Sequence, residues 1–176
     1  MDVGVLERAL SSKCVQRDRR IARRISNDDK MIVYHYDMNV GPYSKLCLIV
    51  DDQEPIRMFV GSILQREKFE TVGAENGQEA LRHLESLGTT VQLIITDITM
   101  PNGDGLELAA AARRLFPFLP VVLISGDVES QRPKYRDSDY EFLQKPFLGG
   151  TLLASVQKAE RMMEIKKQRS DEATTP

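Results

Sequence analysis

Side chains that could do chemistry stand directly behind runs of apolar residues. Asp51 and Asp52 follow the run LCLIV, Asp97 follows QLIIT, Ser125 follows VVLI, and Lys145 follows EFLQ. Two adjacent carboxylates repel each other unless a cation neutralises them. If folding brings these residues together, three carboxylates form a cation site beside an ammonium and a hydroxyl that can bind an anion.

The apolar runs predict the elements that would position these side chains. Most of the runs lack the alternation of a strand with one face in water, so they indicate strands buried on both faces. The five predicted strands are residues 45–51, 69–74, 91–97, 120–125 and 140–144. Apolar residues at helical spacing lie between the strands, and a last helix carries Leu152, Leu153, Val156 and Met163 on one face.

Strands that alternate with helices predict an α/β fold with a parallel sheet covered on both sides. Crossovers between parallel strands are right-handed and place the helices on the faces of the sheet. The carboxyl ends of the strands then share one edge, where the ligands of such sheets bind. This fold would gather the three carboxylates, Ser125 and Lys145 in one pocket.

The helix boundaries have local signals. Pro55 suits the first turn of the first helix. Asn76 can cap the next helix, with Glu79 as its capping-box partner, and Gly88 can end it. On that helix, His83 lies between the core positions and is expected to be exposed.

The connection between Asp127 and Asp139 has a weak helix pattern. It carries Pro133 in its middle, and its clear apolar anchors are Val128 and Tyr135. Because proline interrupts a helix, we expect this helix to be short, irregular or mobile.

Composition bounds the class of protein. Of the 176 residues, 41% are hydrophobic and 28% are charged, which is ordinary for a soluble domain. The net charge of −2 gives no general case for nucleic acid, and Cys14 and Cys47 alone make no disulfide framework or zinc site. Because no segment has about 18 apolar residues in a row and no signal peptide is evident, we expect a cytoplasmic protein without a membrane partner.

The chain is expected to have three parts. Residues 1–44 lack sustained apolar periodicity and indicate a flexible, disordered leader, residues 45–165 form the domain, and residues 166–176 form a polar tail. The run RDRRIARR in the leader is expected to be solvated rather than to bind DNA. Two alternatives stay open: the basic segment docks a partner, or the start site is assigned upstream of the real one.

Magnesium is the cation that suits three carboxylates. Mg²⁺ prefers oxygen ligands and typically binds through one or two carboxylates, waters and a phosphate oxygen. The local charge agrees, because residues 45–147 carry 11 basic and 16 acidic residues. Asp51 and Asp52 can therefore stand side by side as half of a magnesium site.

Four segments together resemble the receiver domain of two-component response regulators. They are LIVDDQEP, LIITDITMPNGDG, VVLISG and FLQKPF, in this order and at these spacings. The resemblance covers about residues 45–165. It implies a flavodoxin-like (βα)5 fold, in which a doubly wound parallel sheet of five strands has the order 2-1-3-4-5.

The resemblance also implies roles for the acidic residues. Asp97 would be the phosphoacceptor, and its phosphoryl group would come from a sensor histidine kinase or a histidine phosphotransfer protein. Asp52 and Asp97 would bind Mg²⁺ directly, and Asp51 would bind it through water. The backbone carbonyl of Thr99 would complete the protein ligands.

A switch is implied by the same resemblance. Ser125 and Lys145 would bind the phosphoryl oxygens, and Ser125 would move inward. In the family, an aromatic residue three positions before the lysine then rotates into the vacated space. Here this residue is Phe142, which lacks the hydroxyl of the commoner tyrosine. Such a switch is a population shift of about 1–3 kcal/mol.

Two positions depart from common patterns of the family. Thr99 and Asp127 lie two residues beyond Asp97 and Ser125, where side chains flank the route of the attacking water. We expect an altered rate of dephosphorylation.

These observations predict a single-domain response regulator, a monomer or weak dimer. Because 29 residues follow Phe147, no DNA-binding or enzymatic output domain is expected, and no enzyme activity beyond self-phosphorylation and self-dephosphorylation. The signal would leave through a downstream protein target or along a phosphorelay. Two alternatives are an unphosphorylated receiver-like binding module and a Mg²⁺-dependent phosphohydrolase with an Asp nucleophile. The hydrolase usually has a second Asp two residues after the first, where this sequence has Thr99.

Overall fold

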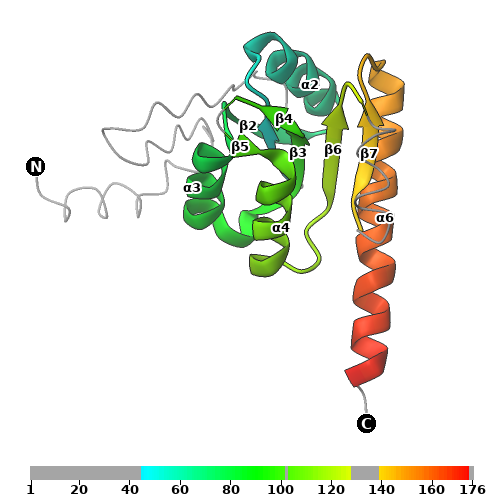
Figure 1. The fold of residues 1–176 in the computed structure, drawn as a ribbon. Coiled ribbons are helices and arrows are strands. Elements are labelled where there is room, and N and C mark those ends of the chain that lie inside the picture. Colours follow the sequence, from blue (N-terminus) through cyan, green and yellow to red (C-terminus); the bar gives the residue numbers. More distant parts are fainter. Residues whose placement is uncertain (1–44, 102, 128–138, 175–176) are drawn as a thin grey trace, which may run out of the picture.

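A five-stranded parallel sheet forms the centre of the protein in a computed structural model, which describes residues 45–101, 103–127 and 139–174 (Figure 1). Its strands are β1 (Lys45–Val50), β2 (Phe69–Ala74), β3 (Val91–Asp97), β6 (Val121–Ser125) and β7 (Glu141–Gln144). They are ordered β2-β1-β3-β6-β7, and each neighbouring pair is parallel. This confirms the predicted flavodoxin-like order, although β6 and β7 each begin one residue later than the apolar runs suggested.

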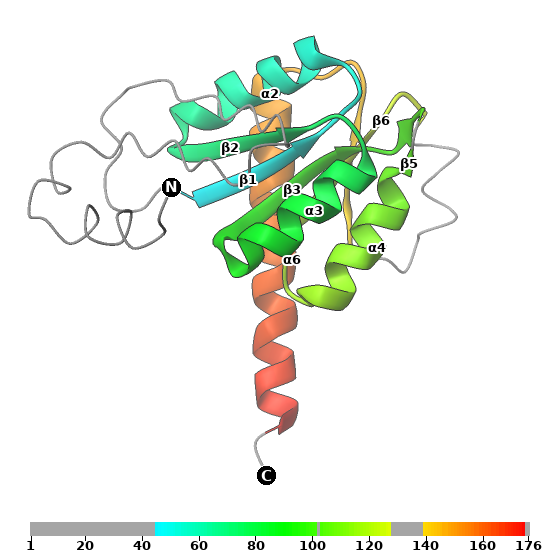
Figure 2. The same ribbon diagram turned by 90° about the vertical axis from the view of Figure 1, so that its left-hand side faces the viewer.

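Helices cover both faces of the sheet. Figure 2 shows α3 (Gly77–Leu87) and α4 (Gly105–Leu115) in front of the sheet and α6 (Gly149–Thr174) behind it. Helix α2 (Glu54–Arg66) lies on the same side of the sheet as α6, and side chains of both helices pack into one hydrophobic cluster on that side. The three interior strands, β1, β3 and β6, therefore lie between two layers of helices.

Strand β1 shows why its apolar run does not alternate. Leu48 and Val50 pack into the core under α3 and α4, whereas Cys47 and Ile49 pack into the core under α2 and α6. All four side chains are at most 3% exposed. A strand with two covered faces needs apolar residues at every position, and burying each large aliphatic side chain contributes about 1.5–3 kcal/mol.

The helix ends follow the local signals with one difference. Pro55 lies in the first turn of α2, and the Asn76 side chain accepts a 2.9 Å hydrogen bond from the amide of Glu79 at the start of α3. The Glu79 carboxylate accepts from the amide of Glu75 at 2.8 Å, rather than from that of Asn76 as in a standard capping box. Gly88 ends α3 with a φ of 56°, a conformation that favours glycine.

Short elements that the sequence pattern did not predict connect the larger ones. Thr99–Met100 (β4) and Gly103–Asp104 (β5) pair as a small antiparallel hairpin between β3 and α4. Gly88–Thr90 form the 3-10 turn η1 before β3. The hairpin matters for the site because it begins two residues after Asp97 in the sequence.

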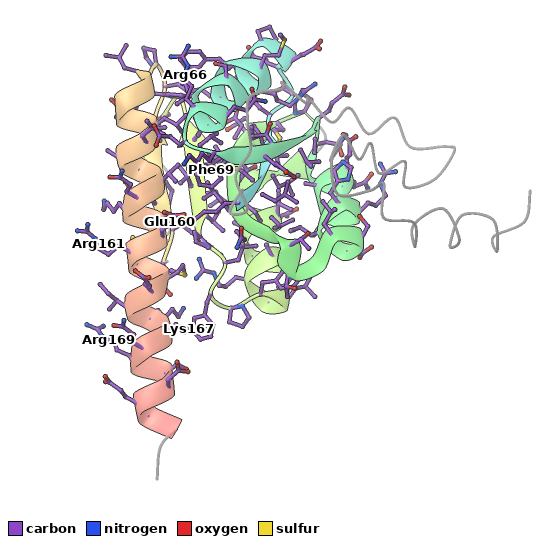
Figure 3. The ribbon with its side chains drawn as sticks, turned by 180° about the vertical axis from the view of Figure 1, so that it is seen from behind. Arg66, Phe69, Glu160, Arg161, Lys167 and Arg169 are labelled. Carbon is purple, nitrogen blue, oxygen red and sulfur yellow. The ribbon has the colours of Figure 1, made fainter. Side chains whose placement is uncertain are left out.

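Helix α6 extends beyond the apolar stripe that predicted it. It continues to Thr174, so most of the segment expected to be a polar tail is helical, and its last turns run past the edge of the sheet (Figure 1). Lys166 forms an ion pair with Asp139, which fixes this part of α6 near the start of β7. In Figure 3, Arg161 and Arg169 project from α6 away from the sheet.

His83 was expected to be exposed, and this prediction is wrong. The residue is 7% exposed and belongs to the buried face of α3, together with Ala80 and Leu84. Its Nε2 lies 3.9 Å from Glu79 Oε1. The predictions for residues 1–44 and for the weak helix at 128–138 lie outside the described residues, and no described helix has the length and hydropathy of a membrane span.

Candidate functional site

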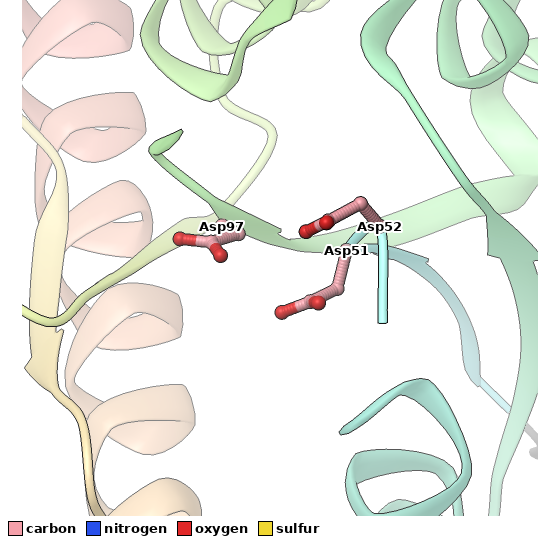
Figure 4. Close-up of side chains that lie close together, drawn as sticks. All are labelled: Asp51, Asp52 and Asp97. Carbon is pink, nitrogen blue, oxygen red and sulfur yellow. The ribbon is translucent and has the colours of Figure 1, made fainter. Parts of the chain in front are cut away.

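Three carboxylates meet at the carboxyl edge of the sheet. Asp51 and Asp52 follow β1, and Asp97 ends β3, the strand beside it. The register pairs Val50 with Thr96, so the residues that follow each of them lie next to each other. Asp51, Asp52 and Asp97 each offer a ligand atom, and these atoms lie within 4.8 Å of one another (Figure 4). The predicted acidic cluster is thus assembled by folding.

Lys145 bridges two of the carboxylates. It directly follows β7, and its backbone amide donates to the carbonyl of Ser125 at 2.7 Å. Its Nζ donates to Asp51 Oδ2 at 2.9 Å and to Asp97 Oδ2 at 2.7 Å. The peptide bond between Lys145 and Pro146 is cis. The ammonium group therefore lies within the acidic cluster, on the side of β7.

Burial dominates the electrostatics of Asp51, which is 2% exposed. Burial raises the pKa of Asp51 and Asp97 adds to the rise, although hydrogen bonds from Lys145 and the Gln53 amide oppose it. Burial alone would lower the pKa of Lys145, but its hydrogen bonds to Asp97 and Asp51 raise it above the ordinary value. The buried Asp51 carboxylate is thus costly to ionise, and a cation lowers that cost.

Ser125 and Thr99 flank Asp97. Ser125 ends β6, beside β3, and its hydroxyl accepts a 3.0 Å hydrogen bond from the amide of Asp127. Thr99, in β4, donates its amide to Asp97 Oδ1 at 3.3 Å. Phe142 lies on β7, is half-buried and packs against the core cluster under α3 and α4. All of the predicted site residues except Phe142 thus lie at or just beyond the carboxyl ends of the strands.

The backbone of Asp97 is held in a tight space. Its carbonyl accepts a hydrogen bond from the Thr96 hydroxyl at 3.0 Å. The amide of Gly105, the first residue of α4, donates to the Ile98 carbonyl at 2.9 Å. A Cβ atom at Gly105 would lie 1.9 Å from the Asp97 carbonyl oxygen. Only glycine lets α4 begin this close to the acidic cluster.

Arg57 is a functional candidate that the sequence reasoning missed. It lies in α2, is 7% exposed, and its Nη1 donates to the backbone carbonyl of Asp51 at 2.7 Å. A periodicity signal existed, because Arg57 shares the buried face of α2 with Val60, Gly61 and Leu64. A charged residue on a buried helix face needs a partner, and here the partner is the loop that carries the carboxylates.

An apolar rim lies beside the site. We define it as Met58 and Phe59 of α2 together with Phe147 and Leu148, which follow Lys145. The rings of Phe59 and Phe147 are 6.1 Å apart, which joins the two segments. Met58, Phe59 and Leu148 are 54%, 46% and 77% exposed. Large apolar side chains that remain in water next to a reactive site favour contact with another protein.

The donor set fits a hard divalent cation. It offers carboxylate oxygens from two strands in a partly buried place, without nitrogen or sulfur ligands among the clustered residues. Mg²⁺ is bound in this way, through a few carboxylates and a substrate phosphate. The lysine beside the carboxylates adds a point charge that can hold an anionic oxygen.

Comparisons with known proteins agree with this geometry. The family model for the response regulator receiver domain matches residues 47–157. An NtrX-like response regulator of Rickettsia bellii is 30% identical over 128 residues, which cover 70% of this chain and 26% of that protein. The sensor kinase CckA of Brucella abortus is 33% identical over 106 residues, which cover 59% of this chain and 11% of that protein. This chain therefore spans about a quarter or less of these curated relatives.

Solved structures show the same fold. The receiver domain of NtrX from Brucella abortus has 33% identity and a TM-score of 0.59, with 65% of this chain and 98% of that chain covered. The chemotaxis response regulator CheY4 of Vibrio cholerae has 28% identity and a TM-score of 0.59, with 66% and 99% covered. The chain belongs to the response regulator receiver domain family of two-component signalling.

Proposed function

We propose that Asp97 accepts a phosphoryl group in a Mg²⁺-dependent reaction and that the chain signals as a phosphorylation switch. The observation that carries the proposal is the meeting of Asp51, Asp52 and Asp97 within 4.8 Å, with the Lys145 ammonium 2.7 Å from Asp97. A carboxylate nucleophile, a cation site and a fixed positive charge are the parts that phosphoryl transfer requires.

The donor is a phosphohistidine on a histidine kinase or a histidine phosphotransfer protein. An oxygen of Asp97 attacks the phosphorus, an O–P bond forms as the N–P bond breaks, and the imidazole nitrogen keeps the electron pair. Asp52, Asp97 and the Thr99 carbonyl would hold Mg²⁺ directly, and Asp51 would hold it through water. A bound Mg²⁺ supplies positive charge that neutralises the phosphoryl oxygens during transfer.

Lys145 and Ser125 hold the transferred group. The Lys145 ammonium already contacts Asp97, so it needs a small movement to reach an oxygen on the new phosphoryl group. The Ser125 hydroxyl leaves the Asp127 amide and turns toward the phosphoryl group. Phe142 then moves inward, which changes the surface around β7 and α6 that a downstream protein contacts.

The phosphodonor docks on the apolar rim. Three of the four rim side chains are exposed, and one of the two segments of the rim begins two residues after Lys145. A donor that delivers its phosphoryl group to Asp97 must cover this part of the surface. The exposed side chains of the rim would be buried on docking, and each can contribute about 1–2 kcal/mol.

At the level of the receiver domain, we propose a cytoplasmic signalling module that is a monomer or weak dimer. Residues 45–165 act as the receiver domain. The receiver domain passes its signal on through contact with another protein.

Phosphorylation by a small phosphodonor tests the proposal. The purified chain is incubated with acetyl phosphate, with Mg²⁺ or with a chelator, and the covalent phosphate is quantified. Acid-stable, base-labile label that needs Mg²⁺ and disappears in Asp97→Asn supports the proposal. Absence of label in the wild-type protein with Mg²⁺ contradicts it.

A further inference from the structure

The peptide that joins the two neighbouring carboxylates is held by a buried arginine. The carbonyl of Asp51 belongs to the peptide bond between Asp51 and Asp52, and it accepts a 2.7 Å hydrogen bond from Arg57 Nη1. The Arg57 side chain is 7% exposed, so it makes this bond away from competing water. This peptide joins the two residues that carry the carboxylates, so a rotation of its plane would shift both side chains.

Backbone amides make further contacts in this loop, beside the bond from Lys145 to the Asp51 carboxylate. The Asp51 amide donates to the Ala74 carbonyl of β2 at 3.2 Å, and the Gln53 amide donates to Asp51 Oδ1 at 2.9 Å. These bonds fix the chain before and after the Asp51–Asp52 peptide. Arg57 supplies a side-chain bond to the carbonyl between them.

Arg57 acts through this contact rather than through its charge on the carboxylate. Burial, Lys145, the Gln53 amide and Asp97 are the causes that set the pKa of Asp51. The second partner of Arg57 is Glu75, at 3.6 Å, and the Glu75 side chain is 68% exposed. An ion pair with so exposed a partner contributes little, so the bond to the Asp51 carbonyl is the main contact.

We propose that Arg57 is a positioning residue for the cation site: it fixes the Asp51–Asp52 peptide so that both carboxylates face Asp97. This inference rests on the proposed function, because it concerns the affinity of the same site for Mg²⁺. Groups that orient metal ligands without touching the metal typically change metal affinity by about 10–100-fold when removed.

Calorimetric titration with MgCl₂ tests this role in the full chain. Arg57→Gln removes the guanidinium, and Arg66→Gln is the matched control, since Arg66 ends the same helix but is exposed. We expect Arg57→Gln to weaken Mg²⁺ binding by about 10–100-fold and Arg66→Gln to leave it within about twofold. Urea unfolding of both variants in chelator measures any loss of stability separately.

The outcomes separate positioning from simple structural support. A structural role alone lowers the stability of Arg57→Gln in chelator but leaves the Mg²⁺ affinity of the folded protein unchanged, and this result overturns the proposal. If Arg57→Gln does not fold, Arg57→Lys is titrated instead. Its single, shorter ammonium cannot reproduce the guanidinium contact, so we expect binding weaker by about threefold or more, and wild-type affinity overturns the proposal.

Failure of the proposed function gives a different result. If the wild-type chain shows no Mg²⁺ binding, both the proposed function and the role of Arg57 are overturned. If the wild type binds Mg²⁺ and Arg57→Gln binds it equally well, only the role of Arg57 is overturned.

Discussion

The Nζ of Lys145 lies 2.7 Å from Oδ2 of Asp97, although the two residues are 48 positions apart in the sequence. The same ammonium group reaches Asp51 at 2.9 Å. Lys145 therefore supplies positive charge that the buried carboxylates need. A divalent cation at these carboxylates must share them with Lys145.

Removal of the lysine charge should strengthen Mg²⁺ binding. Two positive groups at the same carboxylates repel each other, so we expect Lys145→Ala to bind Mg²⁺ about tenfold more tightly, a gain of ~1.4 kcal/mol. Lys158→Ala is the control, because Lys158 pairs with Glu141 on the α6 side of β7 and is 62% exposed. Calorimetric titration measures both. Equal affinity in Lys145→Ala and the wild type would show that lysine and cation do not compete.

Asp51→Asn should stabilise the metal-free protein at neutral pH. Burial raises the folded-state pKa of Asp51, so the folded protein holds this proton more strongly than the unfolded chain does. Stability is therefore lost as pH rises from the unfolded value, about 3.9, through the raised folded value. Asparagine carries no charge and avoids this loss.

Urea unfolding in chelator checks this expectation. Asp51→Asn should be more stable than the wild type at pH 7, and the difference should shrink as the pH is lowered toward 4. Magnesium should reverse the order at pH 7, because only the wild type keeps all three carboxylates. A variant that is less stable than the wild type in chelator at pH 7 refutes the expectation.

Gly105→Ala should be strongly destabilising. Its new Cβ atom would lie 1.9 Å from the Asp97 carbonyl oxygen and 2.8 Å from the Thr96 hydroxyl, so β3 and α4 must move apart. We expect a loss of about 3 kcal/mol or more in the free energy of unfolding. Gly150→Ala is the control, because Gly150 lies in α6 and no other atom lies within 4 Å of an added Cβ. We expect this variant to raise the free energy of unfolding by roughly 0.5–1 kcal/mol. Similar effects of the two substitutions on chemical unfolding would contradict the packing at Gly105.

The apolar rim should speed phosphoryl transfer from a protein donor but not from a small phosphodonor. Leu148→Ala removes the most exposed side chain of the rim, and Leu115→Ala removes a 54% exposed leucine from the end of α4. With a histidine phosphotransfer protein that phosphorylates the wild type, we expect Leu148→Ala to slow transfer about tenfold and Leu115→Ala to leave it unchanged. Phosphorylation by acetyl phosphate should be equal in all three proteins. Wild-type transfer to Leu148→Ala would remove the rim from the donor interface.

Much of the site could be predicted because sheet topology does most of the positioning. Once β1 and β3 are parallel neighbours, Asp51 and Asp97 must lie side by side at the ends of their strands. The same geometry brings Ser125 and Lys145 to that edge, and no detail of side-chain packing is needed to foresee it.

Other features depend on contacts that periodicity does not encode. The strands β4 and β5 have two residues each, too few for a pattern. The last turns of α6 lack an apolar stripe, but Glu164, Lys166, Lys167 and Gln168 are good helix formers, and the pairing of Lys166 with Asp139 supports them. His83 was wrongly predicted to be exposed, because it borders the apolar stripe of Ala80 and Leu84 and is buried together with it.

Location of the phosphoryl group tests the central claim most directly. The wild-type chain is treated with acetyl phosphate and Mg²⁺, digested, and its phosphorylated peptide is fragmented in a mass spectrometer. We expect one phosphoryl group per chain, on Asp97, and none when the metal is chelated. A group on any other residue, or equal labelling of Asp97 in chelator, would contradict a magnesium-assisted acceptor at the meeting point of β1, β3 and β7.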